Sequence, residues 1–392
     1  MRERNWLIAI MLVALALRLG WGMTRTTDRQ ELSTLPDQFE YLQLGENLLK
    51  EQSFHFYDPR FQSEVYAYRM PGYPAMVALC GANLRVVRGV QAVLDASLVV
   101  AFFLMGRQWF GARGGLIAGA LIAINPFLIY FSGLILSETL CGAMIGWGMW
   151  LLVQKRWGWI GAAIVVLSVL VRPSGAGLAL VLGWSAAVVV GDPATLRWVG
   201  LRVLVMTLVI LAPWALRNKS VVKDWIWTTT NGGITLYDGF NPDADGSSNQ
   251  SFTRSMKFLK NMTEVERDHY FDSEARRYIR QHPVRSIELG FWKIARTWSP
   301  VPLSKDFSKP AYKAAGLIYS IPLDTLIVLG LLKGRARRSL KVFLLMPALY
   351  FTILHACSVG SLRYRMPAEA PMAVLAGLGA VSLMKEKVTQ TV

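Results

Sequence analysis

Two side chains near the start of the chain have the types that chemistry on a lipid-linked anionic substrate requires. Asp37 lies in the run LPDQFEY, and Arg69 lies in the later run YRMPGYP. A carboxylate can take the proton of an attacking hydroxyl, and a guanidinium can give forked donors to phosphate oxygens. Asp37 equally suits a helix cap for residues 38–50, because aspartate is a favoured capping residue. The pattern alone leaves both interpretations open.

Further ionisable residues lie at the ends of apolar segments, where a bilayer makes charge costly. Glu138 opens one such segment, in the run LSETL. As alternatives, a helix dipole favours a carboxylate at this position, and arginines at segment ends can extend to lipid headgroups. We interpret Arg18 and Asp95 as a structural pair. Glu40 is a further candidate for catalysis. The further candidates for binding the donor phosphate or lipid are Tyr41, Arg172, Arg217, Arg363, Tyr364 and Arg365.

The elements that must position these residues are mostly membrane helices. The chain has 392 residues, of which 53% are hydrophobic and 17% are charged. The apolar residues gather in long runs, which predict an all-α polytopic membrane protein with about ten transmembrane helices. The runs cover residues 6–23, 88–106, 114–130, 138–154, 158–173, 175–190, 197–213, 314–332, 341–357 and 367–384.

The distribution of lysine and arginine predicts the orientation. With the N-terminus in the cytoplasm, residues such as Arg107, Arg156 and Arg338 fall on cytoplasmic ends, and the short external connections hold few basic residues. Cytoplasmic loops carry such an excess. We therefore expect a multi-pass protein of the cell (inner) membrane with both termini in the cytoplasm. The first apolar run could be a signal peptide, but it continues past Arg18, and we expect a retained helix.

Two long segments then face the outside of the cytoplasm. The first covers residues 24–87, and we expect the active site to use it. Residues 37–50 and 71–84 within it have apolar positions on one helical side, which predicts amphipathic helices at the membrane interface.

The second long segment, 214–313, is expected to form a small mixed external domain between two membrane modules, 1–213 and 314–392. Turn-rich runs are followed by helical patterns over 263–281 and 283–298. An aromatic face can pack against a sugar ring. The candidates here for binding a sugar or an acceptor are Asn231, Tyr237 and Asn241.

Composition and motifs exclude several other classes. The net charge of +16 could indicate nucleic-acid binding, but the basic residues cluster at segment ends, which favours membrane lipids and lipid phosphates. No glycine-rich nucleotide loop appears. The three cysteines fit no disulfide or zinc framework. The four histidines are dispersed, so no cofactor is assigned. A divalent metal held by His55 with Asp58 or Glu64 is the weaker alternative.

Several runs of the chain resemble the GT-C superfamily of membrane glycosyltransferases. The resemblance is to the bacterial enzymes related to protein O-mannosyltransferases and to lipid A aminoarabinose transferase. The similar runs occur in order over nearly the full length. They are DQFEYLQLGENLL, YRMPGYPAMVAL, NPFLIYFSGLILSETL, VRPSG, APWALRN, TNGGITLYDGFNP and LRYRMPAEAP.

The resemblance implies an inverting glycosyltransferase that uses a polyprenyl-phosphate sugar on the periplasmic face. The expected acceptor is a hydroxyl- or amine-bearing glycan, lipid or protein. Asp37 falls on the catalytic acidic position of the first external loop, and Glu138 falls on the second acidic position. The resemblance also implies a donor-phosphate contact for Arg69 and places Arg363 and Arg365 near the lipid phosphate.

The chain departs from the family pattern next to its principal acid. Many relatives carry two adjacent acidic residues in the first loop, whereas here Asp37 is followed by Gln38. Glu40 could take the part of the second acid. The chain also has fewer spans than the better-known members and no large C-terminal soluble domain, so acceptor specificity could differ.

Two other function classes stand beside the enzyme. A transporter or flippase for lipid-linked sugars would also need a cationic external rim and lipid grooves. It predicts essential charges at the bilayer midplane and symmetry between halves. A lipid-binding scaffold without catalysis would need no carboxylate at Asp37. The charges at one rim and the long external segment favour an enzyme.

Overall fold

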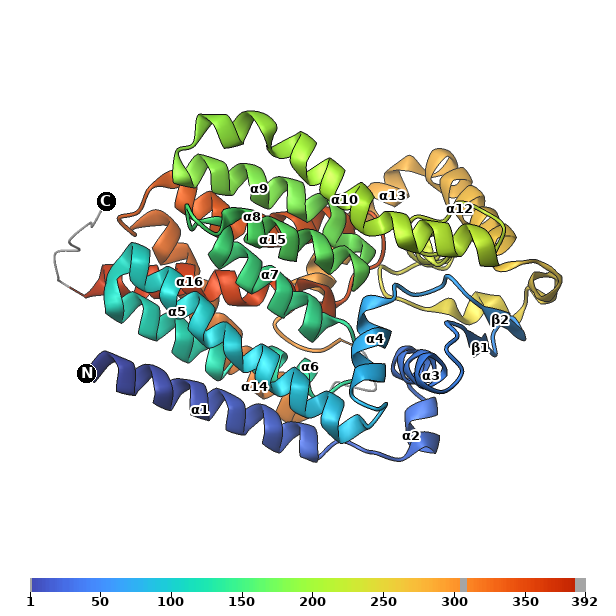
Figure 1. The fold of residues 1–392 in the computed structure, drawn as a ribbon, viewed down its shortest axis with the longest axis horizontal. Helices are drawn as coiled ribbons and strands as arrows, with labels where there is room; N and C mark the ends of the chain where they lie inside the picture. The colour runs from blue at the N-terminus through green and yellow to red at the C-terminus, as the bar shows by residue number, and fades with distance from the viewer. Residues whose placement is uncertain (1, 304–308, 385–392) are drawn as a thin grey trace.

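A computed structural model describes residues 2–303 and 309–384 of the chain. The fold is an elongated bundle of helices with a cluster of shorter elements at one end (Figure 1). The start of α1 and the end of α16 lie together at the opposite end. Residues 385–392, which the sequence analysis assigns to the cytoplasm, lie outside the described residues.

The ten apolar runs all overlap helices, as predicted. Seven helical spans in the described residues are long and apolar enough to cross a membrane, and α7 and α8 are shorter. The protein is therefore a largely helical membrane protein. The helices of the bundle are α1 (Arg2–Met23), α5 (Leu84–Ala123), α6 (Pro126–Ser132), α7 (Glu138–Leu152), α8 (Gly158–Leu167), α9 (Ala176–Val190), α10 (Pro193–Val221), α14 (Pro310–Leu332), α15 (Arg338–Ala356) and α16 (Met366–Leu383).

Helix α5 contains two of the predicted spans, which meet at a sharp turn. Gly111 has a φ of 78°, a value that L side chains rarely adopt, and the backbone leaves the helix there. The two arms then pack closely, since a Cβ on Gly115 would lie 2.6 Å from the carbonyl oxygen of Phe103. The two arms therefore form a helical hairpin.

Helix α16 is the most enclosed helix of the bundle. Its residues from Met366 to Gly379 are all buried, and it packs on α5, α14 and α15. A Cβ on Gly379 would lie 1.9 Å from the carbonyl oxygen of Leu326, so glycine is required for this approach. This packing fixes the short 3₁₀ turn η6 (Leu362–Arg365), which precedes α16 and carries Arg363.

A buried ion pair joins α1 to both arms of α5. Arg18 contacts Asp95 at 2.5 Å between Nε and Oδ2. The same guanidinium donates to the backbone carbonyls of Ile122 and Ala123, at 3.0 Å each. The interpretation of Arg18 and Asp95 as a structural pair is confirmed.

Five short elements follow α1 in the first long segment. They are α2 (Arg29–Ser33), α3 (Pro36–Lys50), β1 (Phe56–Asp58), β2 (Ser63–Val65) and α4 (Gly72–Leu79). Helix α3 matches the predicted amphipathic helix, and α4 ends earlier than predicted. The antiparallel hairpin of β1 and β2 was not predicted. Pro36 opens α3 because its missing N–H is not needed in a first helical turn.

The second long segment differs from the mixed domain that the sequence predicts. Its described residues contain helices and turns, and the chain's described strands lie in the first segment. Helix α10 also continues to Val221, past the predicted boundary at residue 213. The elements that follow α10 are α11 (Gly232–Gly239), η3 (Gln250–Arg254), η4 (Lys257–Asn261), α12 (Glu264–Gln281) and α13 (Pro283–Thr297).

The two long segments pack against each other at one end of the bundle (Figure 1). Helix α12 begins at a capping box formed by Thr263 and Glu266. Its first residue, Glu264, accepts hydrogen bonds from the backbone N–H groups of Tyr66 (2.8 Å) and Ala67 (3.1 Å). The first segment is therefore held in place by the second.

We expect Asp95→Ala to destabilise the fold by about 3–5 kcal/mol, because Arg18 would remain buried without its carboxylate. Thermal unfolding of the detergent-solubilised protein measures this loss. The double variant Arg18→Met/Asp95→Leu should recover much of it, since neither charge remains buried. Arg107→Gln, which removes an exposed pair with Glu3, serves as the control. Equal stability of Asp95→Ala and the wild type would contradict a structural role for the pair.

Candidate active site

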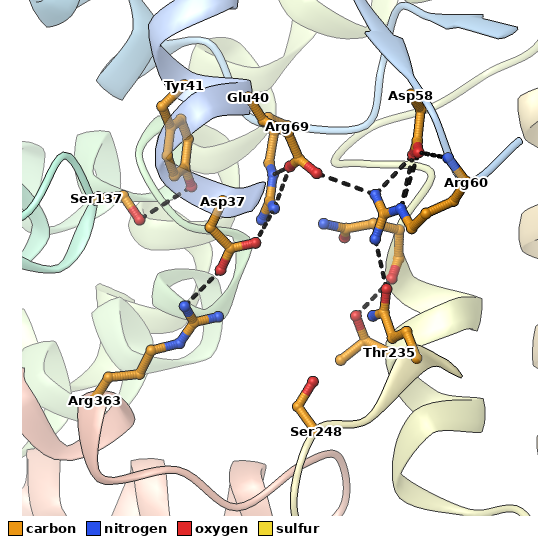
Figure 2. Close-up of polar contacts among 12 residues, drawn as sticks. Asp37, Glu40, Tyr41, Asp58, Arg60, Arg69, Ser137, Thr235, Ser248 and Arg363 are labelled. Carbon is orange, nitrogen blue, oxygen red and sulfur yellow. Dashed lines mark hydrogen bonds and ion pairs between the residues drawn. The ribbon is translucent and has the colours of Figure 1, made fainter. Parts of the chain in front are cut away.

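Asp37 lies between two arginines at the open edge of a charged cluster (Figure 2). Its Oδ1 accepts a hydrogen bond from Nη2 of Arg69 at 2.6 Å. Its Oδ2 accepts one from Nη1 of Arg363 at 2.5 Å. The Asp37 side chain is 33% exposed, the largest fraction in the cluster. The first turn of α3, the run before α4 and the turn before α16 therefore meet at one carboxylate.

Glu40 lies one helical turn after Asp37 and shares its arginine. Nε of Arg69 contacts Oε2 of Glu40 at 2.8 Å, and Nη2 of Arg69 contacts the same oxygen. Because residues three apart lie on one helical face, a single guanidinium can join both acids. The expectation that Glu40 accompanies Asp37 agrees with this geometry, although its role stays a prediction.

Arg60 is a member of the cluster that the sequence analysis missed. Its guanidinium contacts Asp58 at 2.7 Å and Glu40 at 3.1 Å. It also donates to Oε1 of Gln250 at 2.5 Å. Figure 2 shows Arg60 on the side of the second long segment, with Glu40 and Arg69 between it and Asp37. No local motif marks Arg60. The one available signal was its position in the turn after β1, a strand that ends in an aspartate.

Glu138 closes the cluster on the membrane side. Its Oε1 contacts Arg172 at 2.5 Å and Arg363 at 3.6 Å. The side chain is 3% exposed, and Oε2 has no hydrogen-bond partner among the described residues. Arg363 therefore links Glu138 to Asp37. The convergence of these acids and arginines from distant segments is as the sequence analysis expected.

Aromatic and polar side chains orient the charged groups. The Tyr41 hydroxyl lies 3.2 Å from the Ser137 hydroxyl, and the Arg69 guanidinium lies 5.2 Å from the Tyr41 ring centre. The Tyr364 ring has Arg363 at 5.0 Å and Arg172 at 5.5 Å. Such cation–π contacts favour guanidinium over ammonium at these positions.

Gln38 has a structural part that explains why the second acid of the family pattern is absent. Its side-chain oxygen accepts the backbone N–H of Ile135 at 2.8 Å, and the residue is buried. A carboxylate there would add a buried charge without a cation, which is costly. The amide thus fixes α3 to the turn before α7.

The charges of the cluster balance. The four acids Asp37, Glu40, Asp58 and Glu138 face the four arginines Arg60, Arg69, Arg172 and Arg363.

Environment separates the two acids of α3 that belong to the cluster, Asp37 and Glu40. Burial alone would raise the pKa of Asp37, but the guanidiniums of Arg69 and Arg363 outweigh it and hold that pKa well below its usual range. For Glu40 burial dominates and raises the pKa, against the opposing effect of Arg69 and Arg60. Asp37 is therefore ionised at neutral pH, and Glu40 takes up a proton before Asp37 as pH falls.

Two of the predicted phosphate-binding arginines lie outside the cluster. Arg217 donates to the backbone carbonyls of Phe54 and Tyr66, at 2.6 Å each. Arg365 is buried, donates to the carbonyl of Ser299 at 3.0 Å and pairs with Glu369 at 2.6 Å. Their guanidiniums are engaged by structural partners. The structure therefore favours a supporting role for both.

The three predicted sugar or acceptor residues also have structural partners. Asn231 precedes α11, and its side-chain oxygen accepts from Thr229 at 2.8 Å. Tyr237 packs edge-on against Phe252, with ring centres 5.0 Å apart. Asn241 is buried and donates to the carbonyl of Tyr237 at 2.8 Å. Two neighbouring polar side chains of this region, Thr235 and Ser248 (Figure 2), are also engaged: their hydroxyls donate to the carbonyl of Asn231 at 2.8 Å and to Oδ2 of Asp238 at 2.6 Å.

The described residues contain no group of three or more His, Cys, Asp or Glu side chains placed to hold a metal ion. His55, the histidine of the weaker metal alternative, lies 3.9 Å from both Glu51 and Glu64, and its ring packs at a tilt against that of Tyr66. The site carboxylates are paired with guanidiniums, an arrangement that suits an anion better than a cation.

Comparison with known proteins establishes the fold. No protein-family model and no curated protein matches the chain. A solved structure of the archaeal oligosaccharyltransferase AglB from Archaeoglobus fulgidus, in complex with an inhibitory peptide and a dolichol-phosphate, matches with a TM-score of 0.57. The match has 14% identity and covers 97% of this chain and 50% of that chain. The apo form of the A. fulgidus oligosaccharyltransferase matches with a TM-score of 0.56 and 16% identity, over 97% and 50% of the two chains.

The chain thus spans half of the length of these solved enzymes. A match to ArnT from Cupriavidus metallidurans bound to undecaprenyl phosphate has a TM-score of 0.41 and 14% identity, covers 96% of this chain and 78% of that one, and is too weak to carry a conclusion. The chain therefore shares the fold of these oligosaccharyltransferases, in agreement with the fold that the motif resemblance implies.

We expect Arg217→Gln to lower stability by about 1–3 kcal/mol, because two carbonyls would lose their charged donor. Thermal unfolding measures this effect, and Lys219→Gln on the exposed end of the same helix is the control. Binding of a polyprenyl phosphate should be unchanged in Arg217→Gln. A normal unfolding temperature together with weaker phosphate binding would instead support the phosphate contact that the sequence suggests.

Proposed function

We propose that the protein is an inverting glycosyltransferase that moves a sugar from a polyprenyl-phosphate donor to an acceptor on the periplasmic face. The acceptor is a hydroxyl- or amine-bearing glycan, lipid or protein. The observation that carries the proposal is the position of Asp37, a partly exposed carboxylate held between Arg69 and Arg363 at one end of a membrane bundle. A proton acceptor and phosphate-binding cations are thereby present within one site.

The proposed reaction is a single displacement at the anomeric carbon of the donor sugar. The acceptor oxygen attacks from the face opposite the phosphate and forms a new carbon–oxygen bond. The bond from the anomeric carbon to the phosphate oxygen breaks, and its electron pair leaves with the phosphate. Asp37 takes the proton of the acceptor hydroxyl. Arg69 and Arg363 offset the additional negative charge on the phosphate, and the anomeric configuration inverts.

The other members of the cluster hold these groups in place. Glu40 positions Arg69, and Glu138 with Arg172 positions Arg363. We propose that Tyr41 and Tyr364 support the guanidiniums through their ring faces. The apolar helices beside the site would receive the polyprenyl chain.

We further propose that the protein lies in the cell (inner) membrane with both termini in the cytoplasm. Residues 24–87, a loop within the membrane module 1–213, would then lie on the periplasmic side. Residues 214–313, which follow that module and precede the module 314–392, would lie on the same side. The start of α1 and the end of α16 lie at the same end of the bundle, opposite the site, which supports this topology. A flippase for lipid-linked sugars is the alternative, and the transfer assay below distinguishes the two.

We expect Asp37→Asn to reduce transfer by about 10²-fold or more while the protein stays folded, because a carboxamide cannot take the proton. Transfer from a polyprenyl-phosphate sugar in proteoliposomes is the measurement, with an unfolding curve beside it. Glu46→Gln, on the same helix but paired with the exposed Arg29, is the matched control. Wild-type turnover by Asp37→Asn would refute the assignment, and lipid translocation without transfer would favour the flippase.

We expect the acid side of the pH–rate profile to report Glu40 and not Asp37. Burial raises the pKa of Glu40, so the group protonates first as pH falls and then ceases to pair with Arg69. Transfer should decrease as pH falls through that raised pKa. Glu40→Gln should have a lower rate and lack this decrease. An identical acid limb in the wild type and in Glu40→Gln would contradict the assignment.

A further inference from the structure

Both oxygens of the Asp37 carboxylate are engaged in this structure. Oδ1 accepts from Arg69 and Oδ2 accepts from Arg363. A carboxylate in this state is a poor base, since two strong donors stabilise its ionised form. The same contacts engage the arginines that a donor phosphate would need. In this structure the proposed base and the proposed phosphate-binding arginines are therefore paired with each other.

The two arginines differ in how firmly they are held. The Arg69 side chain is 14% exposed and contacts the buried Glu40 through two nitrogens. The Arg363 side chain is 28% exposed, and the Asp37 side chain that it contacts is 33% exposed (Figure 2). An incoming anion meets the pair of Arg363 and Asp37 first.

Arg363 keeps other partners if it leaves Asp37. Its Nε lies 3.6 Å from Glu138, and its Nη2 lies 3.2 Å from the Tyr364 hydroxyl. Because these contacts use other nitrogens, Nη1 can donate a hydrogen bond to a new anion while the guanidinium keeps its contacts with Glu138 and Tyr364. The pair with Asp37 is thus the separable contact of this arginine.

We propose that the donor's phosphate replaces Asp37 as the partner of Arg363, and that this exchange frees Oδ2 of Asp37 to accept the acceptor's proton. The inference rests on the proposed function and adds a regulation of the same site. The base is inactive until the donor is bound, so productive binding is ordered, with the donor before the acceptor. Water or an acceptor that enters an empty site meets a carboxylate with both oxygens already bound to guanidiniums.

The exchange also completes the cycle. After transfer, the proton lies on Asp37, and the departing phosphate carries one more negative charge than it had in the donor. When the lipid phosphate leaves with its counterions, Arg363 returns to Asp37. The renewed contact favours the ionised carboxylate, and the proton passes to water. The step consumes no other reactant.

Competition between Asp37 and phosphate for one arginine makes an unusual prediction about binding. Removal of the carboxylate should strengthen the binding of undecaprenyl phosphate, the probe for the lipid phosphate. The test uses the full chain in phosphatidylcholine nanodiscs, where no other anionic headgroup competes. We expect Asp37→Asn and Asp37→Ala each to bind the probe about tenfold more tightly than the wild type, the order of a close charge-pair coupling.

Two further variants serve as controls. Glu46→Gln removes a carboxylate of the same helix that pairs away from the cluster, and its affinity should equal that of the wild type. Adding Arg363→Gln to Asp37→Asn should abolish the gain, because the arginine released by the first change is then missing. Unchanged or weaker binding in both Asp37 variants, with normal unfolding curves, would overturn the exchange. So would a gain that persists without Arg363.

Failure of this inference is separable from failure of the proposed function. If Asp37→Asn loses transfer and binds the probe no more tightly, Asp37 is the base but does not compete with the phosphate. If Asp37→Asn retains transfer, the assigned base is wrong, whatever the affinity shows.

Discussion

The ion pair between Arg363 and Asp37 is the contact on which the arrangement of the site depends. It joins the first turn of α3 to the turn before α16. A charged pair at the edge of a membrane has a defined geometry only if both backbones are fixed. Pro36 starts α3, and Gln38 ties it to the turn before α7. The buried helix α16 fixes the other partner.

The turn that carries Arg363 also carries a second arginine, Arg365, and the two have different roles. Arg365 lies in the core, between the rings of Phe127 and Trp298, and pairs with Glu369. Arg363, two residues earlier, points toward Asp37. The inner arginine anchors the turn so that the outer one can change partners without moving the backbone.

Much of the fold and part of the site follow from sequence. Long apolar runs locate the membrane helices, and apolar periodicity locates α3. Glu138 is found as a charge at a segment end, and Asp37 and Arg69 are found as an acidic and a basic residue in the first external segment. Arg60 could not be predicted as a site residue, because its contact with Gln250 joins positions 190 residues apart and leaves no local pattern in the sequence. Arg217 looked like Arg363 in sequence. Only the burial and the carbonyl partners of each guanidinium separate them, and both depend on tertiary packing. The β-hairpin was too short for a periodic signal.

The separation of 326 residues between Asp37 and Arg363 also bears on biosynthesis. Translation makes Asp37 and Arg69 long before Arg363. A nascent chain that has not yet reached η6 therefore has the contact between Asp37 and Arg69 but lacks the one with Arg363. If the proposed exchange holds, such a chain has no arginine that can pass from the carboxylate to a donor phosphate.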